Sequence, residues 1–173
     1  PNGYEYSGEW VDGEIRGQGV ARFPNGSVYE GEFAKGKPEG VGKIVFADGG
    51  TYEGDWLDGK ITGQGVAVYA NGVRYEGGFR NAMHHGKGRM ESPGGYVYEG
   101  DWVNGVKDGA ARITYPDGAV YEGGWKEDLM DGPGGVYVYS DGRRYEGSFQ
   151  GGKPHGPRGK GWFADGRLFH EGP

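Results

Sequence analysis

The sequence contains no cysteine, so disulfide bonds and thiolate metal sites are excluded and stability has to come from packing alone. Such a composition fits a reducing compartment. No apolar run approaches the length of a membrane-spanning helix, and no signal-peptide pattern opens the chain. Hydrophobic residues make up only 34% of the chain, which is too few for a conventional two-layer core.

Positive charge is also scarce. The formal net charge is −6, and clustered Lys and Arg, which nucleic-acid binding needs, are missing from most of the chain. The exception is residues 132–173, where six Lys and Arg face four Asp and Glu. We therefore expect no nucleic-acid partner, and only the C-terminal segment could attract an anion.

Glycine and tyrosine are abundant instead, with 41 and 13 copies, and they follow a repeat. The tripeptide Tyr-Glu-Gly returns every 23 residues between Tyr29 and Tyr121; a degenerate copy precedes it and a copy one residue late follows. The repeat units begin near Tyr6, Tyr29, Tyr52, Tyr75, Tyr98, Tyr121 and Tyr145. A period of this size over nearly the whole chain predicts one continuous repeat array, residues 1–173. The function of such an array is expected to depend on a binding surface and not on an active site.

The pattern within each repeat unit predicts two short antiparallel strands. In the unit that begins at Val28, Tyr29, Gly31 and Phe33 are spaced by two and so share one face of a strand. A six-residue connection, 34–39, is expected to lead to a Gly-x-Gly, whose missing β-carbons let a ring lie against the backbone. The second strand ends at an Asn-Gly or Asp-Gly, which predicts a type I′ turn.

A single hairpin is marginal in water, so the units must pair edge to edge to bury their rings. The fold class is therefore all-β: a single-layer, elongated, twisted antiparallel meander of about seven consecutive β-hairpin repeats, a solenoid-like rod. Glycines and the right-handed twist would let the sheet curl over its own aromatic stripe.

The pattern Tyr-Glu-Gly-x-Trp/Phe, then x-x-Gly-Lys, then His/Asp/Glu-Gly-x-Gly, then Asp/Asn-Gly resembles the MORN repeat (membrane occupation and recognition nexus). The resemblance spans 4–172. Three departures are visible: Ala82 and Asp128 replace a loop glycine, Ala111 replaces the second Gly of a Gly-x-Gly, and insertions fall near Pro133 and Pro157. Because Pro1 starts mid-unit, the sequence is expected to be excised from a longer array.

No motif predicts an enzyme, a cofactor or a metal site. The Tyr-Glu-Gly glutamates form a uniform row, whereas acid–base catalysis needs carboxyl groups in unlike environments; we expect them to pair with Lys and Arg of adjacent strands. No phosphate loop, calcium loop or nucleophile elbow is present. His84, His85, His155 and His170 are expected to be structural or solvent-exposed.

Two surfaces could bind a partner. The aromatic stripe is expected to form the core and to leave a partly open groove for a protein segment; its residues are Tyr6, Trp10, Tyr29, Phe33, Tyr52, Trp56, Tyr75, Phe79, Tyr98, Trp102, Tyr121, Trp125, Tyr145 and Phe149. The C-terminal end combines rings expected to mediate self-association (Trp162, Phe163, Phe169) with cations that could contact an acidic lipid (Arg143, Arg144, Lys153, Arg158, Lys160, Arg167).

These features favour a non-enzymatic scaffold that binds protein partners and dimerises through its C-terminal end. The resemblance implies a cytoplasmic, cytoskeleton-associated or peripheral membrane location. Two alternatives stay open: a phosphoinositide- or membrane-binding module, and the accessory repeat domain of a larger enzyme such as a lipid kinase or a lysine methyltransferase.

Overall fold

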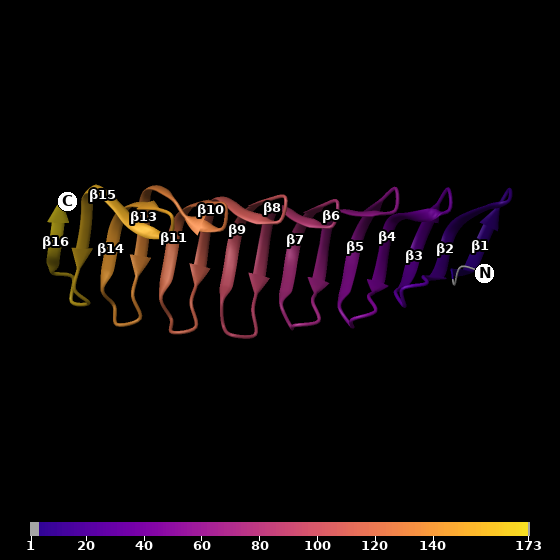
Figure 1. The fold of residues 1–173 in the computed structure, drawn as a ribbon, viewed down its shortest axis with the longest axis horizontal. Coiled ribbons are helices and arrows are strands. Elements are labelled where there is room, and N and C mark those ends of the chain that lie inside the picture. The colour runs from indigo at the N-terminus through magenta and orange to yellow at the C-terminus, as the bar shows by residue number, and fades with distance from the viewer. Residues whose placement is uncertain (1–3, 173) are drawn as a thin grey trace. The chain divides into compact units, whose positions relative to one another are not determined.

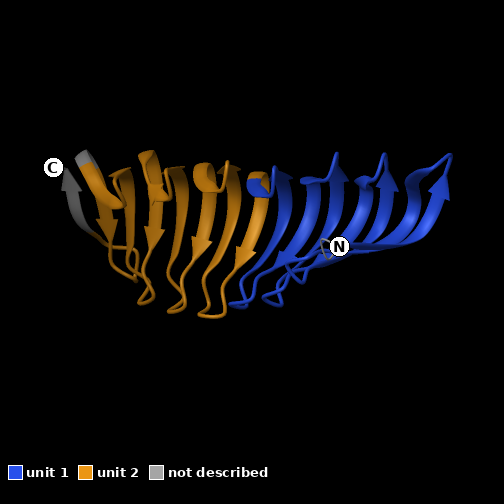
Figure 2. Cartoon of the chain, turned by 45° about the vertical axis from the view of Figure 1, so that its right-hand side comes forward, with its two compact units in different colours: residues 1–84 blue, residues 85–173 orange. Residues whose placement is uncertain are grey.

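The computed structural model describes residues 4–172, without the side chains of 156–158 and 169–172. Over these residues the chain forms sixteen β-strands and no helix. It divides into two compact units, 1–84 and 85–173 (Figure 2). The predicted all-β class and the succession of hairpin repeats are thereby confirmed.

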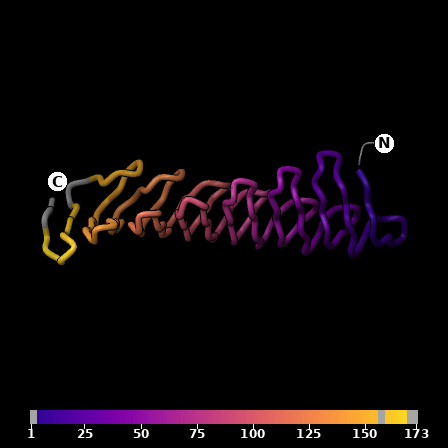
Figure 3. The backbone as a smooth tube through the Cα atoms, turned by 90° about the horizontal axis from the view of Figure 1, so that it is seen from below, coloured from indigo at the N-terminus to yellow at the C-terminus, as the bar shows by residue number. Residues whose placement is uncertain are grey.

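Unit 1 is an antiparallel meander in which each strand pairs with the next one along the chain (Figure 1). Its strands are β1 (Glu5–Val11), β2 (Glu14–Arg22), β3 (Val28–Ala34), β4 (Lys37–Val45), β5 (Thr51–Leu57), β6 (Lys60–Val68) and β7 (Arg74–Arg80). The backbone trace of Figure 3 follows the same hairpins from indigo to magenta.

Unit 2 repeats this arrangement with β8 (Met83–Glu91), which begins two residues before the unit does, β9 (Val97–Val103), β10 (Val106–Thr114), β11 (Val120–Lys126), β13 (Gly132–Val138), β14 (Arg144–Gln150), β15 (Lys153–Trp162) and β16 (Leu168–Gly172). A two-residue strand, β12 (Leu129–Met130), also pairs with β11. The insertion near Pro133 thus splits one strand in two, as Asp131 donates its N–H to Gly124 between β12 and β13.

The predicted type I′ turn is present, but at the other end of each hairpin. Lys35 and Gly36 connect β3 to β4 with φ of 53° and 77°, so the expected six-residue connection is a two-residue turn. At Asn25-Gly26 only the glycine has positive φ, 95°. There the N–H of Gly26 bonds to Phe23, and Asn25 Oδ1 accepts the N–H of Ser27, which makes a three-residue loop.

Buried rings form a ladder along each unit. The ring of Tyr29 meets Phe33 of its own strand at 5.0 Å between centroids and Trp56 of the next repeat at 5.0 Å, both edge-on. Tyr52 repeats the pattern with Trp56 and Phe79, and Tyr121 does so in unit 2 with Trp125 and Phe149. Each repeat therefore depends on its neighbour to bury its aromatic side chains.

Glycine residues leave the space in which the buried tyrosine rings pack against the backbone. Gly31 and Gly42 face each other across β3 and β4, and the ring of Tyr29 lies over both. A β-carbon on Gly42 would overlap this ring, and the Tyr29 hydroxyl donates to the carbonyl of Glu32 at 2.7 Å. The predicted role of the Gly-x-Gly as a packing device is confirmed.

The glutamate row lies on the opposite face, as expected. Glu30 pairs in register with Lys43, and Lys43 with Glu53. In unit 2 the Arg89 guanidinium lies 3.2 Å from the carboxylate of Glu99. The Arg89–Glu99 contact is an exposed cross-strand ion pair of small energetic weight.

Candidate binding groove

The aromatic stripe itself is not the surface of a groove. Eleven of its fourteen predicted residues are buried, because their rings pack against one another and against glycine backbone. They are Tyr29, Phe33, Tyr52, Trp56, Tyr75, Phe79, Tyr98, Trp102, Tyr121, Trp125 and Phe149. Tyr6 and Tyr145 are half-buried, and Trp10 is exposed at the first strand. A partner could not reach most of these rings, which corrects their assignment as groove anchors.

A second aromatic row is open to solvent in unit 1. Phe23, Phe46 and Tyr69 each stand directly after an even-numbered strand, at the start of the three-residue turn. Phe46 and Tyr69 are 37% and 39% exposed. The sequence carries this signal as an aromatic residue two positions before Asn25-Gly26, Asp48-Gly49 and Asn71-Gly72, which are 23 residues apart, but the sequence analysis did not single out these rings.

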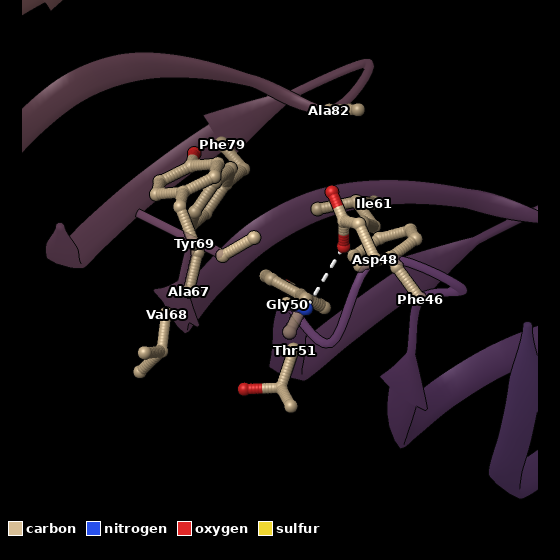
Figure 4. Close-up of a pocket in the computed structure, with 12 residues that line it drawn as sticks. Phe46, Asp48, Gly50, Thr51, Ile61, Ala67, Val68, Tyr69, Phe79 and Ala82 are labelled. Atoms are coloured by element: carbon tan, nitrogen blue, oxygen red, sulfur yellow. Dashed lines mark hydrogen bonds between the residues drawn. The ribbon is translucent and has the colours of Figure 1, made fainter. Parts of the chain in front are cut away.

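Hollows lie between successive rings of this row. One, of about 270 Å³, is lined by Phe23 and Phe46 with Ile44 and Trp56. The next, of about 100 Å³, lies between Phe46 and Tyr69 over Ala67. Figure 4 shows Tyr69 and Phe79 at one end of this second hollow and Phe46 at the other. We call these two hollows with their lining the turn groove.

The far wall of the turn groove is also apolar. Pro38 and Ile61, each the second residue of its strand, line the first and second hollow respectively. The polar part of the lining includes Asp48, whose Oδ1 accepts the N–H of Gly50 at 2.9 Å, and the side chain of Thr51 (Figure 4). The groove is thus an apolar trough with a carboxylate at its edge.

His84 takes the place of Pro38 and Ile61 one repeat further on. Its ring stacks on Tyr75 at 3.7 Å between centroids, and its Nε2 lies 2.6 Å from the Tyr69 hydroxyl. Burial lowers the pKa of His84 to about 4, so the imidazole is neutral at physiological pH. His84 therefore holds Tyr69 in place, which agrees with the structural role predicted for it.

The corresponding row of unit 2 is closed by its own side chains. The Tyr115 ring contacts Tyr96 at 5.7 Å and Tyr137 at 5.8 Å between centroids. Lys107, at the strand position of Pro38, places its ammonium over the rings of Tyr98, Trp102 and Trp125 at 5.5 to 5.9 Å. Rings and a cation occupy here the places that are hollow in unit 1.

A set of acidic residues was missed by the sequence analysis. Glu32, Asp55 and Asp101 follow the glycine of Tyr-Glu-Gly, and each accepts a backbone N–H from the next strand, at 2.6, 2.9 and 3.2 Å respectively. The acceptor lies where the register shifts between the paired strands. These carboxylates cap bulged backbone and are structural.

Three of the predicted C-terminal cations, Arg143, Arg144 and Arg167, contact side chains within the chain. Arg143 and Arg167 bond through Nε to Asp141 and Asp165, both at 2.7 Å. The Arg144 guanidinium lies 4.2 Å from the ring centroid of Trp162. Lys153 and Lys160 are exposed, as is Phe163 at 41%. The side chains of Arg158, Phe169 and His170 lie outside the described residues.

Among the described residues no group of three His, Asp or Glu could hold a metal ion. None of those residues belongs to a helix long and apolar enough to cross a membrane. His155 is exposed, and His85 accepts the N–H of Asn104 at 3.2 Å through Nδ1.

Comparison with solved structures shows a shared fold. The TCP domain of SAS-4 from Drosophila melanogaster, solved in complex with a Proline Rich Motif of Ana2, is 16% identical with a TM-score of 0.54, over 90% of this chain and 84% of that one. The TCP10c domain of Drosophila melanogaster Sas-4 is 15% identical with a TM-score of 0.50, over 90% and 92%. No curated protein sequence shows a significant match.

The model of the MORN repeat matches seven consecutive segments, 6–28, 29–51, 52–74, 75–95, 98–120, 121–143 and 145–157. These segments coincide with the hairpin units and with the period of the buried tyrosines. The chain therefore belongs to the MORN-repeat family.

Proposed function

We propose that this chain is a non-enzymatic protein-interaction scaffold, which binds an extended segment of a partner protein in the turn groove of unit 1. The observation that carries the proposal is the pair of hollows between the rings of Phe23, Phe46 and Tyr69, of which Phe46 and Tyr69 are exposed and Phe23 is half-buried. Exposed aromatic rings beside apolar hollows are the features of a protein-binding hot spot.

Two further observations support a peptide as the ligand. The hollows are small and lie in a row, so they suit successive side chains of one segment better than a bulky small molecule. The Sas-4 TCP domain, which shares the fold, was solved with a Proline Rich Motif of Ana2. A role as a cytoskeletal or membrane-apposed scaffold in the cytoplasm stays a prediction.

Selection from a random peptide display library tests the proposal. The immobilised chain should enrich peptides that fail to bind the Phe46→Ser variant. Serine is tolerated in this position of the repeat, since Ser92 makes the same two turn hydrogen bonds that Phe46 makes. Enrichment that is equal for both proteins, or absent, would contradict a binding role for the turn groove.

Self-association through the C-terminal end is a second candidate. It is supported by Phe163, which is exposed, and by β16, which pairs with β15 on one side only among the described strands. Light scattering over a range of concentrations should show a dimer that Phe163→Ser weakens. A monomer at all concentrations would remove this candidate.

Phosphoinositide binding by the C-terminal cations has weaker support, because Arg143 and Arg167 are already paired with aspartates. Liposome flotation with and without phosphoinositides, comparing the Arg143→Glu/Arg144→Glu variant, tests it. A role as an accessory domain of a larger enzyme is tested by the full-length open reading frame.

A further inference from the structure

We infer that the turn groove is built for a polyproline II segment with basic residues, and that it takes one side chain from every third position of that segment into each hollow. This inference rests on the proposed function, because it specifies the conformation and charge of the peptide bound at the same site. It follows from the spacing of the rings and from the charge of the groove lining.

The spacing of the rings selects the conformation. Phe23, Phe46 and Tyr69 follow alternate strands of an antiparallel sheet, so they repeat at about twice the strand spacing, roughly 9.6 Å. A polyproline II helix advances about 3.1 Å per residue with three residues per turn, which brings the same face back about every 9.3 Å. Positions i and i+3 of such a segment therefore meet successive hollows in register.

Other peptide conformations match the row less well. In a β-strand, residues i and i+3 point to opposite faces, and those on one face recur at about 6.8 and 13.6 Å. In an α-helix, side chains on one face recur about every 5.4 Å, or about 10.8 Å after two turns, which departs by more than about 1 Å from the interval between the rings. A thin polyproline II segment presents single apolar side chains at the required interval.

The lining suits proline and other compact apolar side chains. Each hollow has an aromatic ring at either side, a floor of Ile44 or Ala67, and Pro38 or Ile61 opposite. Aromatic-lined grooves bind polyproline II segments because the ligand is already ordered and loses little entropy on binding. Unit 2 lacks this fit, since Lys107 lies over the rings of Tyr98, Trp102 and Trp125.

Charge complementarity selects basic residues between the apolar positions. The linings of the two hollows contain one acidic side chain, Asp48, and no Lys or Arg. Asp48 lies in the lining of the second hollow, and its carboxylate is oriented by the bond from the N–H of Gly50. An arginine that follows the apolar residue in this hollow would meet that carboxylate at the edge of the groove.

Three labelled synthetic peptides of about 12 residues, four polyproline II turns, provide the probes for anisotropy titrations. The first has proline at every third position with arginine between. The second contains the same residues with the prolines gathered at one end, and the third replaces arginine by glutamate. We expect the first to bind about fivefold or more tightly than the other two.

Variants of the chain locate the binding. Phe46→Ser removes the ring shared by both hollows and should weaken the first peptide about tenfold or more. Tyr139→Ser, at the same turn position in unit 2, should change its affinity less than about twofold. Asp48→Asn keeps the turn, because Asn25 and Asn71 make the same bond, and should weaken binding only at low salt.

Equal affinity for the first and second peptides would contradict the match between every third residue of the peptide and successive hollows. An unchanged affinity of the Phe46→Ser variant for the first peptide would contradict binding in the turn groove. Circular dichroism confirms that each variant is folded. If none of the three peptides binds while display selects Phe46-dependent sequences without periodic proline, the proposed function stands and this inference fails. If display selects nothing either, both fail.

Discussion

The ring of Tyr29 lies against Gly42 of the neighbouring strand, so closely that a β-carbon there would overlap the phenol. The Tyr29 hydroxyl is thereby directed to the carbonyl of Glu32. The same relationship recurs between Tyr52 and Gly65 and between Tyr145 and Gly159. Each of these repeats is thus stabilised by a tyrosine ring that packs directly against the backbone of a glycine.

Gly42→Ala should lower the free energy of unfolding by about 3 kcal/mol or more, since the added methyl group forces a buried ring aside. Gly94→Ala is the matched control. Its β-carbon would meet only a ring atom of Tyr96 at 4.0 Å, so its effect should stay within about 0.5 kcal/mol. Urea unfolding compares the two, and an equal loss in both would contradict the packing role of Gly42.

Ala82→Gly should stabilise the chain by about 0.5 to 1 kcal/mol. Ala82 has a φ of 67° at the second position of a type I′ turn, where a β-carbon is strained. Asp128, with a φ of 69°, is the comparison: its carboxylate accepts the N–H of Lys107 at 2.8 Å, so Asp128→Gly loses a bond while it relieves strain. Thermal unfolding should therefore rank Ala82→Gly above Asp128→Gly, and the reverse order would contradict the strain argument.

Ala111→Gly should restore a hydrogen bond to Trp125. Trp56 and Trp102 donate their indole N–H to the carbonyls of Gly42 and Gly88, whereas the buried indole nitrogen of Trp125 has no partner in the structure. In the repeat, Ala111 stands where those glycines do. We expect an indole N–H proton that exchanges more slowly in the variant, and unchanged exchange would contradict this explanation.

Acid should destabilise the chain as the pH falls from about 6.5 to about 4. Because burial lowers the pKa of His84 to about 4, the unfolded chain binds a proton in this range and the folded chain does not. The stability contribution of neutral His84 is therefore complete above the unfolded pKa and is lost below it. His84→Gln should flatten this part of the pH profile of stability, and an unchanged profile would contradict the burial of a neutral His84.

Alkali should also destabilise the chain, in this case through its buried tyrosines. Burial raises the pKa of Tyr52, Tyr115 and Tyr121 to about 12, so the folded chain retains protons that the unfolded chain releases near pH 10. Stability is complete below the unfolded pKa and falls as the pH rises toward 12. Ultraviolet titration should show that the buried tyrosines ionise together with the loss of the circular dichroism signal of the β-sheet. Ionisation of these tyrosines near pH 10 while the sheet stays folded would contradict their burial.

The sequence predicts the repeat far better than the groove. Period and alternation determine the hairpins, the glycine contacts of Tyr29 and the glutamate row, because these are local or between adjacent repeats. The type I′ turn was predicted at the wrong end of each hairpin, because an Asn-Gly pair such as Asn25-Gly26 fits a three-residue loop as readily as a type I′ turn. Whether a ring is buried depends on how the bulged strands curl, so the sequence analysis did not single out Phe46 and expected Tyr29 to line an open groove as well as to form the core.

The binding role of the turn groove is tested most directly by NMR mapping of amide shifts while the periodic proline–arginine peptide is added. We predict that the shifts concentrate at Ile44, Phe46 and Ala67, with Tyr139 and its neighbours unaffected, and that Phe46→Ser abolishes them. Shifts centred instead on Phe163 and the C-terminal strands, or none at saturating peptide, would contradict a binding groove in unit 1.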